Sequence, residues 1–128
     1  MSHETRSTEF ADAELQKARE ALADARILQE GGGSTAGTVD RIYYAAFHAA
    51  RAVLSVRGSL PEDEDHVPAQ FAEDVVIAEE TSMEDAQFLN QMRAYRKRGD
   101  FEQEPLDLDV EAKIARADRF IEDMAEFC

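Results

Sequence analysis

The stretch between Val39 and Gly58, VDRIYYAAFHAARAVLSVRG, constrains the fold more than any other part of the chain. It is the longest run that is mostly apolar, and its apolar residues recur at the three- and four-residue spacing of an amphipathic helix. These residues are Val39, Ile42, Tyr43, Ala46, Phe47, Ala50, Val53 and Leu54. The pattern predicts a long helix with one broad buried face, around which the other segments pack.

A polar line runs along a neighbouring face of the same predicted helix. Asp40, Tyr44, His48 and Arg51 follow one another at steps of four, four and three residues. This spacing places side chains above one another on one side of a helix. The central helix is therefore expected to carry a core face and, beside it, a face on which a functional site could lie.

The segment before this stretch also follows helical spacing. A first helix is predicted from about Thr8 to Glu30, because Thr8 can cap it and apolar residues recur along it. The glycines at 31–33 are expected to end this helix and let the chain reverse. Residues 1–7 are predicted to form a flexible tail.

Three further helices are predicted after the central one. A short third helix is expected to begin near Pro68, which suits a first helical turn. A fourth is expected to open at Thr81 and to end at Gly99, and the last to begin near Asp107. No period of two residues in the sequence indicates a strand. We therefore predict a single all-α domain over residues 1–128, an up-and-down bundle of four to five helices.

The charge balance restricts what this domain can bind. Acidic residues outnumber basic ones by 28 to 14, which gives a net charge of −14, and only three of the basic residues are lysine. Such a composition suits a salt-rich cytoplasm, where self-repulsion is screened, as in halophilic proteins. It argues against a general nucleic-acid-binding surface, because phosphate contacts need clustered cations. Any binding of RNA or nucleotides would then be confined to a local basic site.

Other features of the composition favour a cytoplasmic protein. The one cysteine, Cys128, cannot form a disulfide within the chain, which suits a reducing compartment. No apolar run approaches the ~18 residues of a membrane-spanning helix, and the polar, acidic N-terminal segment is unlike a secretion signal. The three histidines lie far apart and lack metal-ligand spacing, so neither a metal nor a cofactor is expected.

The segment RAYRKR, residues 93–98, is the exception in this acidic chain, because it holds four of the 14 basic residues. Cations in the last turn of a helix interact well with the helix dipole, which is one explanation. Arg96 differs from its neighbours, because it continues the inward stripe of the fourth predicted helix. A guanidinium in that position needs a carboxylate or a ligand anion. Asp40 and Asp100 are the candidate carboxylates.

Several motifs follow one another along the chain: DRIYYAAFHAARAVLSVRG, then His66 and Phe71, then YRKRGDF, and finally ADRFIEDM in the last predicted helix. In these motifs and their order, the chain resembles the HEPN domain family. The chain resembles in particular the small stand-alone prokaryotic branch associated with minimal nucleotidyltransferases. The resemblance implies a helical domain that forms a homodimer. It also implies a minimal nucleotidyltransferase as partner, in a toxin–antitoxin or nucleotide-binding pair.

The resemblance also implies an alternative, a metal-independent ribonuclease toxin. The signature of such HEPN enzymes is an arginine followed, after four to six residues, by a histidine. The histidine exchanges a proton with the ribose hydroxyl or the leaving oxygen, and the arginine stabilises the charged phosphorane. Arg96 matches this arginine, but Asp100, Phe101 and Glu102 occupy the positions of the histidine, and no histidine follows His66.

The two interpretations use overlapping residues. A ribonuclease would use Arg96 together with a substitute base, either Asp100 or His48. A nucleotide- or phosphate-binding partner would hold the phosphate with a group of residues from two helices: Arg93, Arg96, Tyr44 and Asp40. Whether the protein is an enzyme therefore stays open at this point.

Two further possibilities concern the central helix. Arg41 and His48 also have the spacing of the ribonuclease signature, although on a different helix, and His48 could equally be satisfied by a structural neighbour. Ala45, Ala49 and Ala52 are small enough to let another helix approach closely. They are the expected contact surface for a second copy or a partner.

Overall fold

The computed structural model describes residues 2–76, 83–101 and 108–128, and side chains within 8–74, 83–99 and 108–128. Within these ranges, five α-helices, one 3-10 turn and one π-helical turn follow one another: α1 (Ser2–Glu30), α2 (Thr35–Arg57), η1 (Glu64–His66), α3 (Val67–Phe71), η2 (Ala72–Val76), α4 (Met83–Phe101) and α5 (Val110–Ala125). No strand occurs in these ranges, in agreement with the predicted all-α bundle. No described helix is long and apolar enough to cross a membrane.

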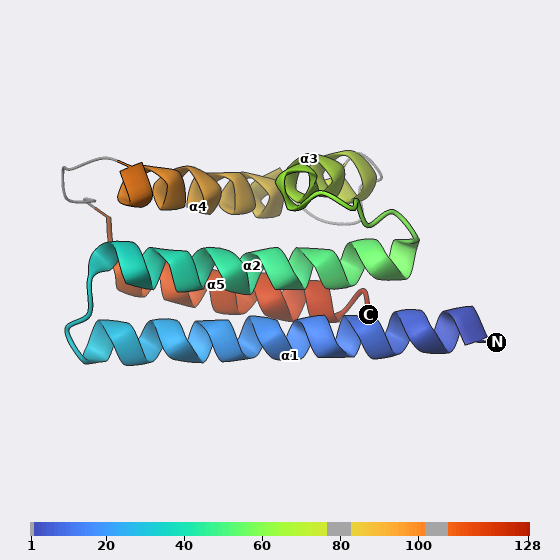
Figure 1. Ribbon diagram of the computed structural model, residues 1–128, viewed down its shortest axis with the longest axis horizontal. Coiled ribbons are helices and arrows are strands. Elements are labelled where there is room, and N and C mark those ends of the chain that lie inside the picture. The colour runs from blue at the N-terminus through green and yellow to red at the C-terminus, as the bar shows by residue number, and fades with distance from the viewer. Residues whose placement is uncertain (1, 77–82, 102–107) are drawn as a thin grey trace.

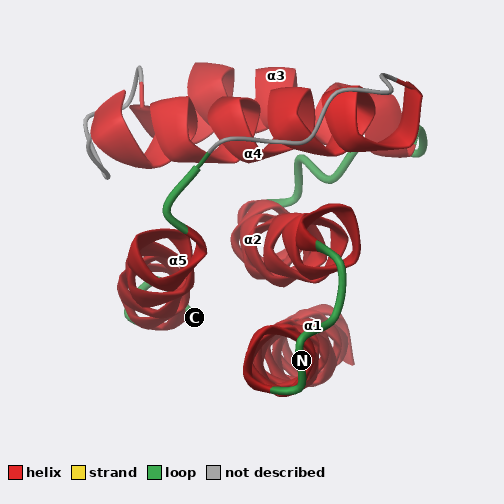
Figure 2. Ribbon diagram, turned by 90° about the vertical axis from the view of Figure 1, so that its left-hand side faces the viewer, coloured by secondary structure: helices red, strands yellow, loops and turns green. Residues whose placement is uncertain are grey.

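The helices surround α2. Figure 1 shows α1 along one side of α2 and α4 with α3 on the other, while α5 lies behind. In Figure 2, α1, α2 and α5 are seen end-on, and α4 and α3 cross over them. The helix α2 packs against α1, α3, α4 and α5, so it forms the centre of the bundle.

The apolar stripe predicted for the central helix is buried throughout. Val39, Ile42, Val53 and Leu54 are fully buried, and so is the ring of Phe47 except for 2% of its surface. Phe71 of α3 and Phe120 of α5 pack against each other in the same core, with ring centroids 5.7 Å apart. Burial of this many large apolar side chains in one continuous cluster is the main force that holds the bundle together.

Local sequence signals set the ends of α2 and α5. Ser34 caps α2 by accepting a hydrogen bond from the amide of Gly37 at 3.0 Å. Gly58 ends α2 in the left-handed conformation with φ of 76°, and a glycine adopts that conformation without the steric cost of a side chain. Asp109 caps α5 by accepting from the amide of Ala112 at 3.1 Å, so α5 begins three residues later than predicted.

Other helix ends differ from the sequence prediction. The helix α1 already begins at Ser2, so the segment expected to be a flexible tail is helical from residue 2 onward; it contains no glycine or proline that would interrupt a helix. Gly99 does not end α4, which continues to Phe101. A glycine inside a helix costs only about 1 kcal/mol and stops it only when it takes a positive φ, which Gly99 does not. The predicted start of α4 at Thr81 lies outside the described residues.

The alanines of α2 pack inside a single copy of the chain. Ala45, Ala49 and Ala52 are all fully buried in one copy, although they were predicted to contact a second copy or a partner. That prediction was wrong because α1 packs along the length of α2 and covers this side. The helix α1 also carries fully buried alanines, Ala18 and Ala25.

We expect this close contact to tolerate no larger side chain. Ala18→Leu should lower the free energy of unfolding by roughly 1–3 kcal/mol, because the added methylene groups must push α1 away from α2. Urea denaturation followed by circular dichroism would measure this. Ala23→Leu is the matched control on the exposed side of α1 and should change stability by less than about 0.5 kcal/mol. Equal stability of the two variants would contradict tight packing between α1 and α2.

Candidate functional site

Arg96 extends from α4 onto α2 and contacts three residues there. Its Nε lies 3.7 Å from Oδ1 of Asp40, one of the two carboxylates that the sequence offered as partners. Its guanidinium carbon lies 5.5 Å from the ring centroid of Tyr43 and 5.0 Å from that of Tyr44. Such cation–π contacts stabilise the side chain by about 0.5–1 kcal/mol each at exposed sites. Arg96 is thus held in a defined position while a third of its side chain, 33%, stays exposed.

Arg93, one turn earlier on α4, is also held by a carboxylate. Its Nη2 lies 3.7 Å from Oδ1 of Asp65 in η1, and 28% of its side chain is exposed. We call Asp40, Tyr43, Tyr44, Arg93 and Arg96 the Arg96 cluster. The cluster places two positive charges together on the surface of a strongly acidic protein.

Tyr43 of the Arg96 cluster stays neutral. Burial raises the pKa of Tyr43 above its ordinary value, although the charges of Arg93 and Arg96 act in the opposite direction. A neutral phenol adds no negative charge to the site. The positive charge of the two arginines is therefore opposed by carboxylates alone, among the described residues Asp40 and Asp65.

His48 belongs to a different set of contacts, between α2 and α1. Its Nδ1 lies 2.6 Å from Oε2 of Glu14, a carboxylate of α1 whose side chain is only 3% exposed. Arg51 and Lys17 each place a nitrogen 3.8 Å from the other carboxylate oxygen. We call Glu14, Lys17, His48 and Arg51 the Glu14 network. It surrounds one buried carboxylate with three basic side chains, as a buried charge requires.

The Glu14 network holds its carboxylate in the charged form. Burial alone would raise the pKa of Glu14, but the hydrogen bond with His48 and the charges of Arg51, His48 and Lys17 outweigh burial and bring the pKa below its ordinary value. Glu14 is therefore ionised at neutral pH. Its stabilising contacts link the first half of α1 to α2.

The polar residues of α2 thus contact two different helices, α4 and α1. Asp40 and Tyr44 contact Arg96 of α4, whereas His48 and Arg51 contact Glu14 of α1. Asp40 and His48 lie eight residues apart, which is about 12 Å along the helix axis. Tyr44 lies close to both His48, one candidate base, and Arg96: its ring centroid is 6.3 Å from that of His48 and 5.0 Å from the guanidinium carbon of Arg96. The side chain of Asp100, the other candidate base, lies outside the described residues.

Sequence reasoning missed Glu14 altogether. A signal was present, because Glu14 follows Ala11 by three residues and precedes Ala18 by four, so it lies on the buried stripe of α1. A glutamate on an apolar stripe implies cationic partners on the facing helix.

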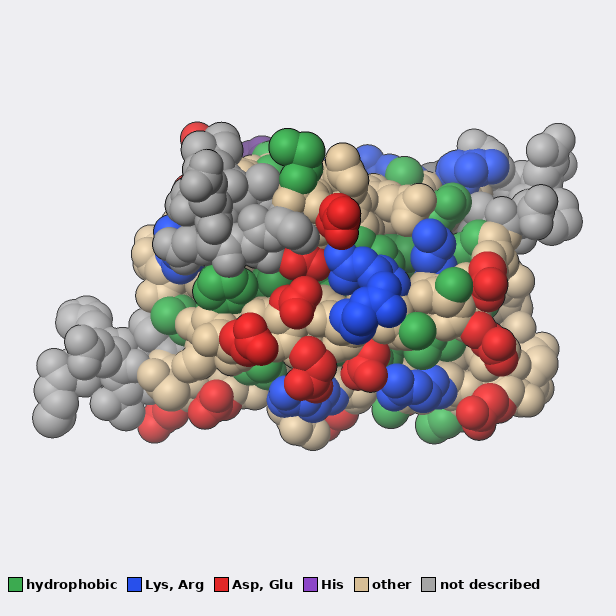
Figure 3. All heavy atoms as spheres, turned by 180° about the vertical axis from the view of Figure 1, so that it is seen from behind, with side chains coloured by type: hydrophobic (Ala, Val, Ile, Leu, Met, Phe, Trp, Pro, Cys, Tyr) green, Lys and Arg blue, Asp and Glu red, His purple; other side chains and the backbone are tan. Residues whose placement is uncertain are grey.

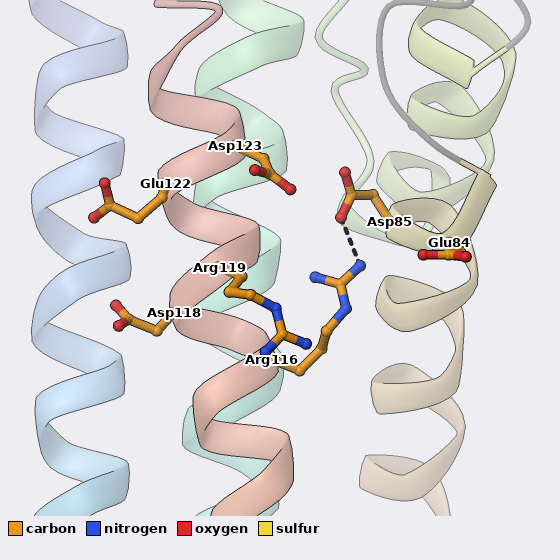
Figure 4. A pocket seen from close by; sticks show the side chains of 7 residues that line it. All are labelled: Glu84, Asp85, Arg116, Asp118, Arg119, Glu122 and Asp123. Atoms are coloured by element: carbon orange, nitrogen blue, oxygen red, sulfur yellow. Dashed lines mark hydrogen bonds and ion pairs between the residues drawn. The ribbon is translucent and has the colours of Figure 1, made fainter.

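A third polar group lies between α4 and α5. Asp85 of α4, whose side chain is 2% exposed, accepts a hydrogen bond of 2.7 Å from Nη2 of Arg116. Figure 4 shows Arg116 and Asp123 of α5 both pointing toward Asp85, while Asp118 points away. Burial, followed by the negative charge of Asp85, raises the pKa of Asp123. This group ties α5 to α4.

The face that carries α5 shows charges of both signs. In Figure 3, lysine and arginine side chains gather near the centre of this face and acidic side chains surround them. Such mixing leaves little field of a single sign over α5. Among the described residues, no group of three or more histidine, cysteine, aspartate or glutamate side chains could hold a metal ion.

The Glu14 network predicts a specific loss of stability in acid. Because the folded-state pKa of Glu14 is lowered, its contribution is present above the ordinary value of 4.5 and is lost as the pH falls through the folded-state pKa. Glu14→Gln should lower the free energy of unfolding by about 2 kcal/mol at pH 7. The difference from wild type should shrink below pH 4.5. Urea denaturation across this pH range measures both, with exposed Glu9→Gln as the control. A difference that did not depend on pH would contradict an ionised Glu14.

The contact between Asp85 and Asp123 predicts the opposite effect of acid on stability. Since the pKa of Asp123 is raised in the folded state, the folded protein pays a penalty once Asp123 ionises, and protonation in acid removes that penalty. Asp123→Asn should therefore stabilise the protein at pH 7, by about 0.5 kcal/mol because the residue is exposed. Thermal unfolding at pH 7 would detect this, and Glu122→Gln on the same helix is the control. Destabilisation by Asp123→Asn would show that its charge is favourable.

Comparison with known proteins identifies the family. The family model of the HEPN domain matches residues 11–127, nearly the whole chain. The chain is also similar to a UPF0332 protein from Thermotoga maritima, with 34% identity over 86 residues, or 67% of this chain. The match spans a little less than two thirds, 64%, of the length of that relative. The five-helix bundle and these matches agree, and the chain belongs to the HEPN domain family.

Proposed function

We propose that this HEPN protein is a binding partner of a minimal nucleotidyltransferase, and that the Arg96 cluster is the surface that binds it. The observation that carries the proposal is the pair Arg93 and Arg96, held side by side on α4 in a chain of net charge −14. Most of such a surface repels acidic groups. A local pair of arginines is where an acidic segment or a bound nucleotide of a partner would be attracted.

Preorganisation supports a role in binding. The rings of Tyr43 and Tyr44 and the carboxylate of Asp40 fix the guanidinium of Arg96 before any ligand arrives. A side chain that is already ordered loses less conformational entropy on association. An incoming carboxylate or phosphate would then replace, or share, the contact with Asp40, which suits bidentate recognition by arginine.

The ribonuclease alternative has less support from the geometry. General acid–base catalysis needs a proton-transferring group within hydrogen-bond reach of the reacting atom. His48 is bound to Glu14 on the side of α1 and lies about 12 Å along α2 from Asp40. The homodimer, the toxin or antitoxin role and the salt-rich cytoplasm stay predictions from the sequence.

Co-purification tests the proposed partnership. The tagged protein would be co-expressed with a minimal nucleotidyltransferase encoded beside its gene, and the complex would be measured by size-exclusion chromatography with light scattering. We expect a stable complex with wild type. Arg93→Ala/Arg96→Ala should weaken it by at least tenfold, because two charge-assisted contacts of about 1.5 kcal/mol or more are lost.

A matched control separates local from general charge effects. Arg26→Ala removes an exposed cation that lies near Asp118 on another side of the molecule, and it should leave the complex intact. A complex that forms equally well with all variants would place the interface elsewhere. Metal-independent cleavage of RNA by wild type that is lost in Arg96→Ala would establish the ribonuclease alternative instead.

A further inference from the structure

A cleft of about 300 Å³ follows the contact between α1 and α2. All but one of its lining side chains are charged or polar: Lys17, Glu20, Asp24, Arg41, Tyr44 and His48. Two of these are permanent cations and two are carboxylates, so neither sign dominates the lining. The volume lies at the lower end of the range of small-molecule sites, which limits the cleft to a compact ligand.

The opposite charges of the cleft are kept apart. The guanidinium carbon of Arg41 lies 5.2 Å from the ring centroid of Tyr44 on the same helix. Within the part of the chain that the structure describes, neither Arg41 nor Asp24 is in an ion pair, and Glu20 accepts a hydrogen bond of 3.2 Å from Gln16. Arg41 is partly buried, and a guanidinium in that position needs an anionic partner. A ligand that carries charges of both signs would join the two sides.

The register of the two helices sets the order of these charges. The helices α1 and α2 run side by side in opposite directions (Figure 1). Glu14 contacts His48, and both helices rise by about 1.5 Å per residue, so Arg41 lies opposite Ala21. The two carboxylates of the cleft come one position before and three positions after Ala21. The guanidinium and the carboxylates are therefore within reach of one small molecule.

The second cation of the cleft lies toward its other end. Nζ of Lys17 is 3.8 Å from Glu14, and 58% of the lysine side chain is exposed, so the ammonium group can turn toward a ligand. Nδ1 of His48 is engaged by Glu14, and this hydrogen bond fixes the ring as the end wall. The row of charges thus begins with a cation beside His48 and ends with the carboxylate of Asp24.

A ligand of a single sign would suit only half of this lining. An anion alone would be repelled by Glu20 and Asp24, and an amine alone by Lys17 and Arg41. A carboxylate suits the planar guanidinium, which binds it with two parallel hydrogen bonds. An ammonium group donates up to three hydrogen bonds, which suits a pair of carboxylates. A compact molecule with both groups and no net charge matches the whole lining.

We propose that the cleft between α1 and α2 binds a free α-amino acid of zero net charge. Its carboxylate binds Arg41 and Lys17, and its ammonium group donates to Glu20 and Asp24. Its side chain packs on the ring of Tyr44. This site goes beyond the proposed partner surface and lies apart from it, although Tyr44 contacts Arg41 in the cleft and Arg96 in the Arg96 cluster.

Isothermal titration calorimetry on the purified full-length chain tests the proposal. Each standard amino acid is titrated singly, at moderate ionic strength because salt screens the contacts of charged groups. We expect at least one amino acid of zero net charge to bind, and glutamate and lysine to bind more weakly than it does. Absence of binding by every amino acid at millimolar concentration would overturn the proposal, and so would tighter binding of either charged amino acid.

Two derivatives of the amino acid that binds most tightly test the need for both charges. The amide lacks the carboxylate, and the N-acetyl derivative lacks the ammonium group. Each should bind about tenfold more weakly than the parent, the usual effect of losing one charge-assisted contact. If either derivative bound as tightly as the parent, recognition of a dipolar ligand would be refuted.

Variants locate the two ends of the ligand. Arg41→Gln should weaken binding of the amino acid about tenfold and reduce its preference over the amide, because the carboxylate has lost a partner. Asp24→Asn should instead reduce the preference over the N-acetyl derivative. Arg19→Gln and Asp12→Asn, on exposed positions of α1 outside the cleft, are the matched controls and should bind as wild type does.

Circular dichroism would verify that all four variants are folded. Exchanged preferences, with Arg41→Gln affecting the N-acetyl derivative and Asp24→Asn the amide, would contradict the assigned orientation. Loss of binding in Arg96→Gln but not in Arg41→Gln would assign the ligand to the Arg96 cluster and overturn the proposal.

Discussion

The enclosure of α2 is the constraint on which the rest of the structure depends. The helix packs against α1, α3, α4 and α5, so little of its surface faces water. Every polar group on an enclosed helix must find a partner on a neighbouring element, since an unpaired buried group costs several kcal/mol. The polar line of α2 therefore becomes a series of contacts between helices: Asp40 to α4, and His48 and Arg51 to α1.

The same constraint leaves two guanidinium groups at the edges of α2. Side chains at the contact between two helices are ordered by their neighbours, and those at its rim stay partly open to solvent. Arg96 lies at the rim between α2 and α4, and Arg41 at the rim between α2 and α1. Tyr44 contacts both guanidinium groups, at 5.0 Å and 5.2 Å. A change in the position of this ring would affect both contacts.

Features set by neighbouring residues were predictable from the sequence. The buried stripe of α2, its end at Gly58 and the all-α fold each follow from spacing or from a local backbone requirement. Features that depend on distant residues were not. Glu14 can be buried only because His48, 34 positions away, pairs with it. The spacing of the alanines in α2 indicates that another helix packs closely against it, but does not indicate which helix. The partner-facing role of Ala45 was therefore misassigned. Of the two carboxylates expected near Arg96, Asp40 is in contact with it, and the side chain of Asp100 lies outside the described residues.

The chemistry of the Arg96 cluster follows from the position of its carboxylate. Asp40 lies 3.7 Å from Arg96 and partly neutralises it, so a single phosphate would have to compete for the guanidinium. A second arginine, Arg93, offsets part of this competition, and a larger acidic surface would gain more from both than a small anion would. His48 lies next to the cluster, with its ring centroid 6.3 Å from that of Tyr44, but its Nδ1 is engaged by Glu14. The arrangement therefore supports the proposed attraction of an acidic partner more than a catalytic role.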